Sequence, residues 1–174
     1  MSPRLSAALV ILATLSLVGC ERRDQRTANE KVRAANKALE EADDLRAQDR
    51  AMFTELSVVS PERMTAAGKQ CMTRREGALV RFDTAAALLH EAADLKVSPV
   101  YRNYLLLRAE AASKRARATS LTLAQCRAMV DGDEPESWSD MDRDKSFELL
   151  SRYVAILERR ARKILEDHPD VFME

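Results

Sequence analysis

Apolar residues recur at intervals of three and four along most of the chain, which is the spacing of one face of an α-helix. They form four stripes of similar length, separated by short polar segments. The four stripes are, in order, Val32, Ala35, Leu39, Ala42, Leu45, Met52, Phe53, Leu56 and Val59; Met64, Ala67, Cys71, Ala78, Phe82, Ala85, Leu89 and Ala92; Tyr101, Leu105, Ala109, Ala112, Ala116, Thr119, Leu123, Cys126 and Val130; and Leu149, Leu150, Tyr153, Ile156, Leu157, Ile164 and Leu165. Polar residues interrupt the first stripe near Arg46 and Asp49 and the second stripe at Arg75. The pattern predicts four helices that pack through their apolar faces.

Two segments carry the residues that favour the start of a helix. Ser60-Pro61-Glu62 combines a good N-cap, a proline at the first helical position and an acidic residue in the first turn. Ser98-Pro99 repeats the combination of serine and proline one helix length later. Because the residue before a proline disfavours the α conformation, the preceding helix must end before each serine. A third start is expected at Ser137 or Ser139, which precede several aspartates.

The sequence predicts an all-α fold, an antiparallel up-down-up-down four-helix bundle. Four helices of about 27 to 35 residues that are joined by short connectors pack in sequence order. The first helix has no sharp cap, and we expect it to begin near Thr27 or Asn29. The bundle then spans residues 29–168, and residues 169–174 form a C-terminal tail. A tetratricopeptide-type solenoid fits less well, because its repeat of about 34 residues holds two helices.

The second predicted helix contains two glycines, Gly68 and Gly77, which are its expected weak points. Each glycine costs about 1 kcal/mol relative to alanine in a helix interior. We expect a kink or break between Arg75 and Gly77. Small residues have the opposite effect in the third helix, where alanines should let neighbouring backbones approach closely; these are Ala109, Ala112 and Ala116.

The N-terminal segment has the layout of a secretory signal. A positive start at Arg4 precedes an apolar run from Leu5 to Val18, which is shorter than the roughly 20 residues of a membrane span. The run ends in Leu17-Val18-Gly19-Cys20, which resembles the lipobox of bacterial lipoproteins. The resemblance implies that Cys20 is lipidated, that residues 1–19 are a signal peptide and that residues 20–28 form the lipidated cysteine with a polar tether. An ordinary signal peptide with an incidental cysteine is the alternative.

The same resemblance implies a location in the cell envelope. Several acyl chains on one cysteine make a stable membrane anchor, whereas one chain is marginal. In lipoproteins of this type an aspartate after the cysteine favours the inner membrane, and here that residue is Glu21. We therefore expect a protein anchored to the membrane and facing the periplasm, with the outer membrane favoured over the inner membrane.

Charge and cysteine content narrow the expectations further. The chain has 28 basic and 28 acidic residues, so it has no charge excess that would suggest a nucleic-acid partner. Apart from Cys20 the cysteines are Cys71 and Cys126, and two cysteines in an oxidising compartment are expected to pair. They lie at nearly equal distances along the chain from a helical turn at Val97, so an antiparallel hairpin brings them to similar heights. We predict a disulfide between them; two buried free thiols are the alternative.

The sequence offers few candidates for chemistry. His90-Glu91-Ala92-Ala93-Asp94 resembles the H-E-x-x-H zinc motif but has no second histidine and no evident third ligand. The acidic segment 131–144 fails the calcium-loop pattern, because Glu136 occupies the position of the required glycine; an irregular calcium site and a solvated turn are its two interpretations. Trp138 in this segment is either a cap on the core or a binding anchor. We assign no metal, no cofactor and no catalytic residue.

We therefore expect a non-catalytic lipoprotein that is anchored to the membrane and binds a protein partner or has a structural role. It would be an accessory subunit of an envelope machine or an immunity-type protein, and an exposed patch outside the helix seams would support that function. The alternative is a ligand-binding or sensing lipoprotein with a pocket between helices. That alternative predicts a cavity in the alanine-rich core.

Overall fold

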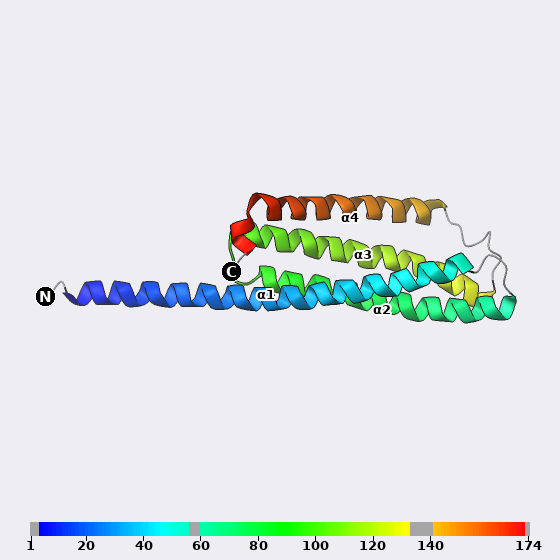
Figure 1. Cartoon of the computed structure of the whole chain (residues 1–174), viewed down its shortest axis with the longest axis horizontal. Helices are drawn as coiled ribbons and strands as arrows, with labels where there is room; N and C mark the ends of the chain where they lie inside the picture. The colour runs from blue at the N-terminus through cyan, green and yellow to red at the C-terminus, as the bar shows by residue number, and fades with distance from the viewer. Residues whose placement is uncertain (1–3, 56–59, 133–140, 173–174) are drawn as a thin grey trace.

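The fold is an all-α four-helix bundle, as the sequence predicts (Figure 1). A computed structural model describes the backbone of residues 4–55, 60–132 and 141–172 and the side chains of residues 23–49, 60–132 and 144–172. The elements are α1 (Arg4–Glu55), α2 (Pro61–Ala93), α3 (Pro99–Asp131), α4 (Met141–Asp167) and the short 3₁₀-helix η2 (Pro169–Phe172). No strand occurs in these described ranges.

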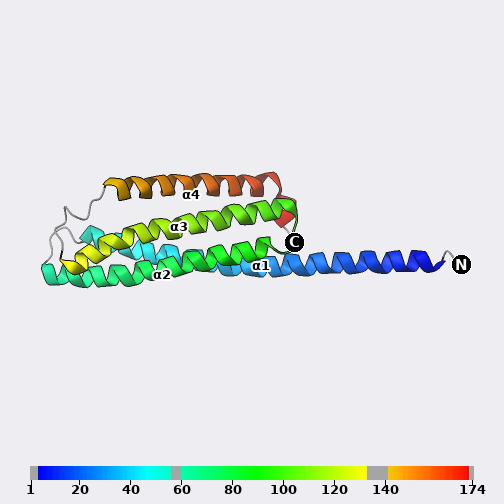
Figure 2. The same ribbon diagram turned by 180° about the vertical axis from the view of Figure 1, so that it is seen from behind.

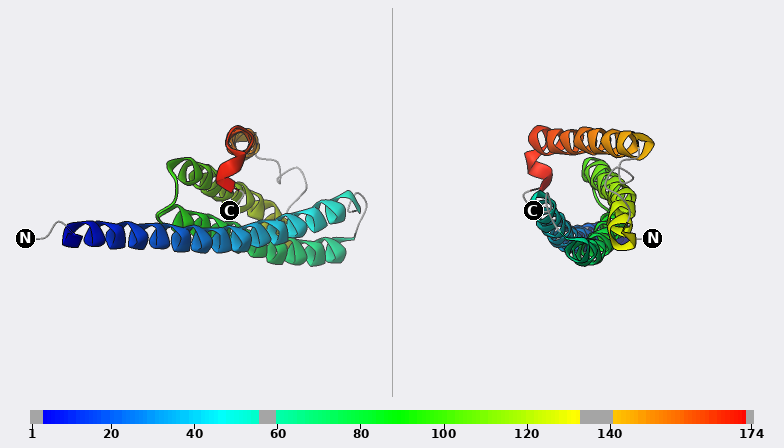
Figure 3. Two further views of the ribbon diagram at one scale, coloured as in Figure 1. Left: turned by 60° about the vertical axis from the view of Figure 1, so that its left-hand side comes forward. Right: turned by 90° about the vertical axis from the view of Figure 1, so that its right-hand side faces the viewer.

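Consecutive helices run antiparallel and pack as neighbours, α1 on α2, α2 on α3 and α3 on α4 (Figures 1 and 2). The last helix is inclined to the first. Figure 3 looks almost down the axis of α4 in its left panel, while α1 runs across the same view. Because α4 packs mainly on α3 and diverges from α1, one side of the bundle is less closed than a regular bundle would be.

The helix starts that the serine–proline pairs predict are confirmed. Ser60 and Ser98 are the N-cap residues of α2 and α3, and each precedes its proline in an extended conformation. The Ser98 hydroxyl accepts a hydrogen bond from the backbone N–H of Tyr101 at 3.1 Å. Gly132 ends α3 in the left-handed region, with φ of 77°, which glycine adopts without steric cost. The third predicted start, at Ser137 or Ser139, lies outside the described residues, and α4 begins at Met141.

The prediction that the first helix begins near Thr27 or Asn29 is wrong, because α1 begins at Arg4. Residues 20–28 are helical, so this segment advances only about 1.5 Å per residue and is much shorter than an extended tether. It also makes contacts, since Ala28 is fully buried and Asp24 accepts a hydrogen bond from the Lys96 N–H at 3.3 Å. The N-terminal half of α1 projects beyond the other helices (Figure 1). None of the described helices has both the length and the apolar content to cross a membrane.

The two glycines of α2 sit in close contacts instead of at a break. The helix runs unbroken from Pro61 to Ala93, so the expected break near Gly77 does not occur. A Cβ atom on Gly68 would lie 2.9 Å from Met129 Cβ and 2.9 Å from Val130 Cγ2. Glycine at position 68 therefore lets α2 and α3 approach closely.

The core consists largely of alanine. Ala109, Ala112 and Ala116 are buried, which confirms the predicted close seam of α3. Around them lie two clusters of apolar side chains. One fills the end of the bundle next to the α2–α3 turn, and the other surrounds Phe82 between α1, α2 and α3.

Candidate functional site

A groove of about 380 Å³ lies between α1 and α4, with α3 as its floor. The residues that line it are Asn36, Leu39, Glu40 and Asp43 of α1; Tyr104, Arg108, Ala111, Ala112 and Arg115 of α3; and Glu158, Ala161, Arg162 and Leu165 of α4. A second hollow of about 440 Å³ continues on the far side of Arg115, toward Val154. The groove exists because α4 packs on α3 and not along α1.

A ladder of polar contacts joins α1 to α3 along this groove. Its three hydrogen bonds connect Tyr101 to Asn29 (2.6 Å), Arg108 to Asn36 (2.9 Å) and Arg115 to Asp43 (2.8 Å). In each pair the two residues are 72 positions apart. The steps along each helix are seven residues, which is nearly two helical turns, so the same two faces stay in register. The two helices thus run in the same direction and are held together by polar side chains.

Aromatic side chains close the end of the groove near the α2–α3 turn. Phe172 of η2 packs edge-on against Tyr101 and Tyr104, with ring centroids 5.3 and 5.0 Å away. Burial raises the pKa of Tyr101 to about 12. Its hydroxyl therefore stays protonated and donates its hydrogen bond to Asn29. This arrangement anchors the C-terminal segment on α3.

Arg115 joins the floor of the groove to both walls. Its Nη1 donates to the Asp43 carboxylate at 2.8 Å, and its Nη2 donates to the Glu158 carboxylate. The three side chains are between 23% and 50% exposed, so water and salt weaken these ion pairs. This contact connects α1 and α4 at the point where the groove meets the second hollow.

Arg108 lies near the aromatic end of the groove. Its Nη1 donates to the Tyr104 hydroxyl at 2.8 Å and its Nη2 to the Asn36 amide oxygen at 2.9 Å. The guanidinium also stands over the Tyr104 ring, 5.8 Å from its centroid. All of these partners are neutral, which distinguishes Arg108 from Arg115.

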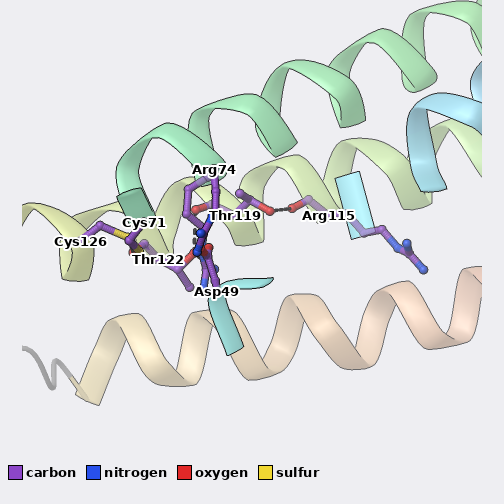
Figure 4. Close-up of polar contacts among 8 residues, drawn as sticks. Asp49, Cys71, Arg74, Arg115, Thr119, Thr122 and Cys126 are labelled. Carbon is purple, nitrogen blue, oxygen red and sulfur yellow. Dashed lines mark hydrogen bonds and ion pairs between the residues drawn. A yellow bond between two sulfur atoms is a disulfide. The ribbon is translucent and has the colours of Figure 1, made fainter. Parts of the chain in front are cut away.

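A buried ion pair connects α1, α2 and α3 at the other end of the bundle (Figure 4). Asp49 is fully buried, and its Oδ2 accepts a hydrogen bond from Arg75 Nε at 2.6 Å, while Arg74 Nη1 lies 3.7 Å from its Oδ1. Arg75 also donates to the Thr122 hydroxyl at 2.5 Å. Burial raises the pKa of Asp49 above its ordinary value, and the two arginines oppose that shift. Unpaired charge is costly in an interior, so these groups depend on one another.

Cys71 and Cys126 lie beside this ion pair (Figure 4). Their sulfur atoms are 1.99 Å apart and their Cα atoms 5.6 Å apart, so the predicted pair is at disulfide distance. Both residues are buried in the seam of α2 and α3. The bridge lies one helical turn from Arg75 on α2 and one turn from Thr122 on α3, so the covalent and the polar contacts hold the same region.

An exposed apolar stripe runs along α4, and its position differs from the prediction. Leu149, Tyr153 and Ile156 are 65%, 40% and 44% exposed, although the sequence pattern places them on the buried face. Leu157 of the predicted stripe is buried, as expected, and the face that packs on α3 also contains Val154 and Ala161. The Tyr153 hydroxyl donates to Glu110 of α3 at 3.0 Å, which raises the pKa of the tyrosine.

Leu106 of α3, which is 41% exposed, extends this surface. It lies one helical turn before Glu110 and so on the same side of α3. We call Leu106, Leu149, Tyr153 and Ile156 together the α3–α4 stripe. Helical periodicity places the stripe and the groove on opposite flanks of the seam between these two helices.

The remaining predicted residues lie apart from these features. Cys20 lies within α1, and its side chain is outside the described residues, as are Trp138 and most of the acidic segment 131–144. His90 and Asp94 are exposed, and Glu91 forms an ion pair with Lys31 at 2.5 Å. Within the described part of the chain, no group of three or more histidine, cysteine, aspartate or glutamate side chains is placed to hold a metal.

The comparisons with known proteins give no relative. No protein-family model, curated protein or solved structure matches this chain.

Proposed function

We propose that this protein is a lipoprotein of the cell envelope that faces the periplasm, with the outer membrane favoured, and acts as a non-catalytic protein-binding module. The lipobox that ends at Cys20 supports the anchor. The α3–α4 stripe supports the binding role, and it is the observation that carries this proposal. Contiguous apolar side chains outside the helix seams are typical of interaction sites. An accessory subunit of an envelope machine and an immunity-type protein both fit this role.

The charge around the stripe defines the chemistry of the partner. Between residues 145 and 163, the part of α4 that does not line the groove carries an excess of basic side chains; these are Lys145, Arg152, Arg159, Arg160 and Lys163, against Glu148. Glu148 already forms an ion pair with Arg152. Such a surface complements an apolar protein patch that is bordered by acidic residues.

The anchor is tested by metabolic labelling with a clickable fatty acid. The natural chain should incorporate the label and fractionate with membranes, whereas the Cys20→Ser variant should lose the label. Cys71→Ser is the matched control, because it removes a cysteine that lies in the bundle and outside the lipobox, so this variant should keep the label. Labelling that survives Cys20→Ser, or that is absent from the natural chain, would contradict the anchor.

The partner is tested by placing a photoreactive amino acid at Ile156 in living cells. We expect one discrete crosslinked protein, whose contacted surface is apolar and bordered by acidic residues. Val80 is the control position, because it is an aliphatic residue of α2 that is 60% exposed and lies away from the stripe. The proposal fails if position 156 gives no product, or the same products as position 80.

The groove supports a second function, the binding of a ligand between the helices. Its volume of about 380 Å³ lies in the range of small-molecule sites. Its floor contains Ala111 and Ala112, so the alanine-rich region leaves open space, as this function requires. Native mass spectrometry of protein released from membranes tests it, and a small molecule that remains bound is the expected result.

A further inference from the structure

We propose that the groove binds an anionic amphiphile, and that Arg108 recognises its carboxylate or phosphate group. This inference rests on the second function proposed above, the binding of a ligand in the groove. It names the chemistry of the ligand and the residue that selects it.

Arg108 is a half-buried cation with only neutral partners among the described residues. Its guanidinium donates to Tyr104 and Asn36 and forms no ion pair in that part of the chain. Two other half-buried arginines form ion pairs with acidic side chains, Arg75 with Asp49 and Arg115 with Asp43. Arg108 therefore retains donor capacity and a charge that an anionic group would balance.

Several other charges in and beside the groove form ion pairs with one another. Arg115 and Arg46 both form ion pairs with Asp43, and Arg115 also binds Glu158. Two exposed side chains of opposite charge stand on the two walls, Glu40 on α1 and Arg162 on α4. The charged residues that line the groove therefore sum to zero, and the case for an anion rests on Arg108, whose hydrogen-bond partners Tyr104 and Asn36 are both neutral.

The space beside Arg108 is elongated, and part of its lining is apolar. Ala111 and Ala112 form the floor, and Leu39 and Leu165 stand on the walls. From Arg108 to Arg115 the groove follows α3 for seven residues, which is about 10 Å. A single acyl chain with its anionic head at Arg108 matches both the charge and the shape. A neutral amphiphile would match only the shape.

Photoaffinity labelling of the natural full-length chain in phosphatidylcholine nanodiscs tests this proposal. One probe is a diazirine-bearing fatty acid and the other is the corresponding fatty alcohol, so the two differ only in the head group. Mass spectrometry then locates the labelled peptides. We expect the fatty acid to label the peptides that contain Leu39 and Leu165 about tenfold more than the alcohol does, because hydrogen bonds to charged groups contribute strongly to binding.

Variants test the role of Arg108 itself. Arg108→Gln should reduce labelling by the fatty acid to the level of the alcohol. Arg117→Gln is the matched control, because Arg117 is an exposed arginine of the same helix that does not line the groove, and it should leave labelling unchanged. Circular dichroism verifies that each variant is folded. The comparison of the fatty acid with the fatty alcohol uses the natural chain, so it tests the proposal even if a variant does not fold.

The outcomes separate this inference from the function on which it rests. Equal labelling of the groove by both probes would show that it binds ligands and would overturn the role of Arg108. Labelling of neither groove peptide would overturn both proposals. Competition by unlabelled dodecanoate and dodecyl phosphate distinguishes a carboxylate from a phosphate head group. The compound whose head group matches that of the natural ligand should displace the probe at the lower concentration.

Discussion

Gly68 lies where α2 and α3 approach closely. Its replacement by alanine tests two opposing contributions to stability, the gain in helix propensity and the cost of overpacking. Helix propensity alone predicts that Gly68→Ala stabilises the protein by about 1 kcal/mol. The structure predicts that this gain is cancelled or reversed, because the new Cβ would lie 2.9 Å from Met129 Cβ and Val130 Cγ2 and 3.0 Å from the Cys126 carbonyl oxygen. Overpacking of this kind costs about 1–3 kcal/mol. The net result is a change between neutral and about 2 kcal/mol of destabilisation.

Gly77 is the matched control in the same helix. A Cβ atom there would lie 3.2 Å from Leu45 Cδ1, which is the end of a flexible side chain that moves more easily than a neighbouring backbone. Gly77→Ala should therefore gain most of the propensity term, up to about 1 kcal/mol. The two substitutions have the same chemistry and differ only in their surroundings.

Urea denaturation of both variants, followed by circular dichroism under non-reducing conditions, measures the difference. We expect Gly68→Ala to be about 1–3 kcal/mol less stable than Gly77→Ala. For a chain of this size that corresponds to several degrees in melting temperature, at about 2–4 °C per kcal/mol. If Gly68→Ala is as stable as Gly77→Ala, the close packing of α2 on α3 is refuted.

Three further measurements test the contacts between the helices. Alkylation before reduction should find no free thiol at Cys71 or Cys126, and reduction should cost about 4 kcal/mol of stability, because the bridge spans a separation of 55 residues; two alkylated thiols would contradict the bridge. The raised pKa of Asp49 means that the folded state takes up a proton at a higher pH than the unfolded chain, so this group favours folding at low pH and the benefit is lost as pH rises through the raised pKa. Asp49→Asn should therefore fall further behind the natural protein in urea titrations at pH 4 than at pH 7, and a constant difference would argue against the shift. Arg115→Gln should cost up to about 1 kcal/mol in low salt and less in molar salt, and it should speed hydrogen exchange in α4 but not in α2; equal effects in both helices would exclude a local role.

The sequence predicts the helices and the cysteine pair because both depend on local or regularly repeating features. A serine followed by a proline defines the start of a helix within a few residues, and the starts at Ser60 and Ser98 were correct. The nearly equal distances of Cys71 and Cys126 from one turn predict their pairing, which needs only an antiparallel hairpin. The start of α1 was missed, because no capping residue marks it and polar residues after Cys20 suggested a tether.

The groove and the ion pairs were missed because they depend on contacts between helices. Asp49 and Arg75 appeared as interruptions of two separate stripes, yet they bind each other in the interior. Two opposite charges at inward positions of neighbouring helices were the available signal. The inclination of α4 has no comparable signal, so Leu149 and Ile156 were assigned to the core although they are exposed.

The helical form of α1 sets the distance between the proposed anchor at Cys20 and the groove. Under this proposal the acylated Cys20 holds the start of α1 at the membrane surface. Asn36, the partner of Arg108, follows 16 residues later along the same helix, which is about 24 Å of helical rise. A flexible tether would let the groove reach the bilayer, whereas a continuous helix that stands upright holds the groove away from it. With α1 upright, the two proposals together imply that the ligand leaves the bilayer before it reaches Arg108, and they predict an amphiphile carried through the periplasm.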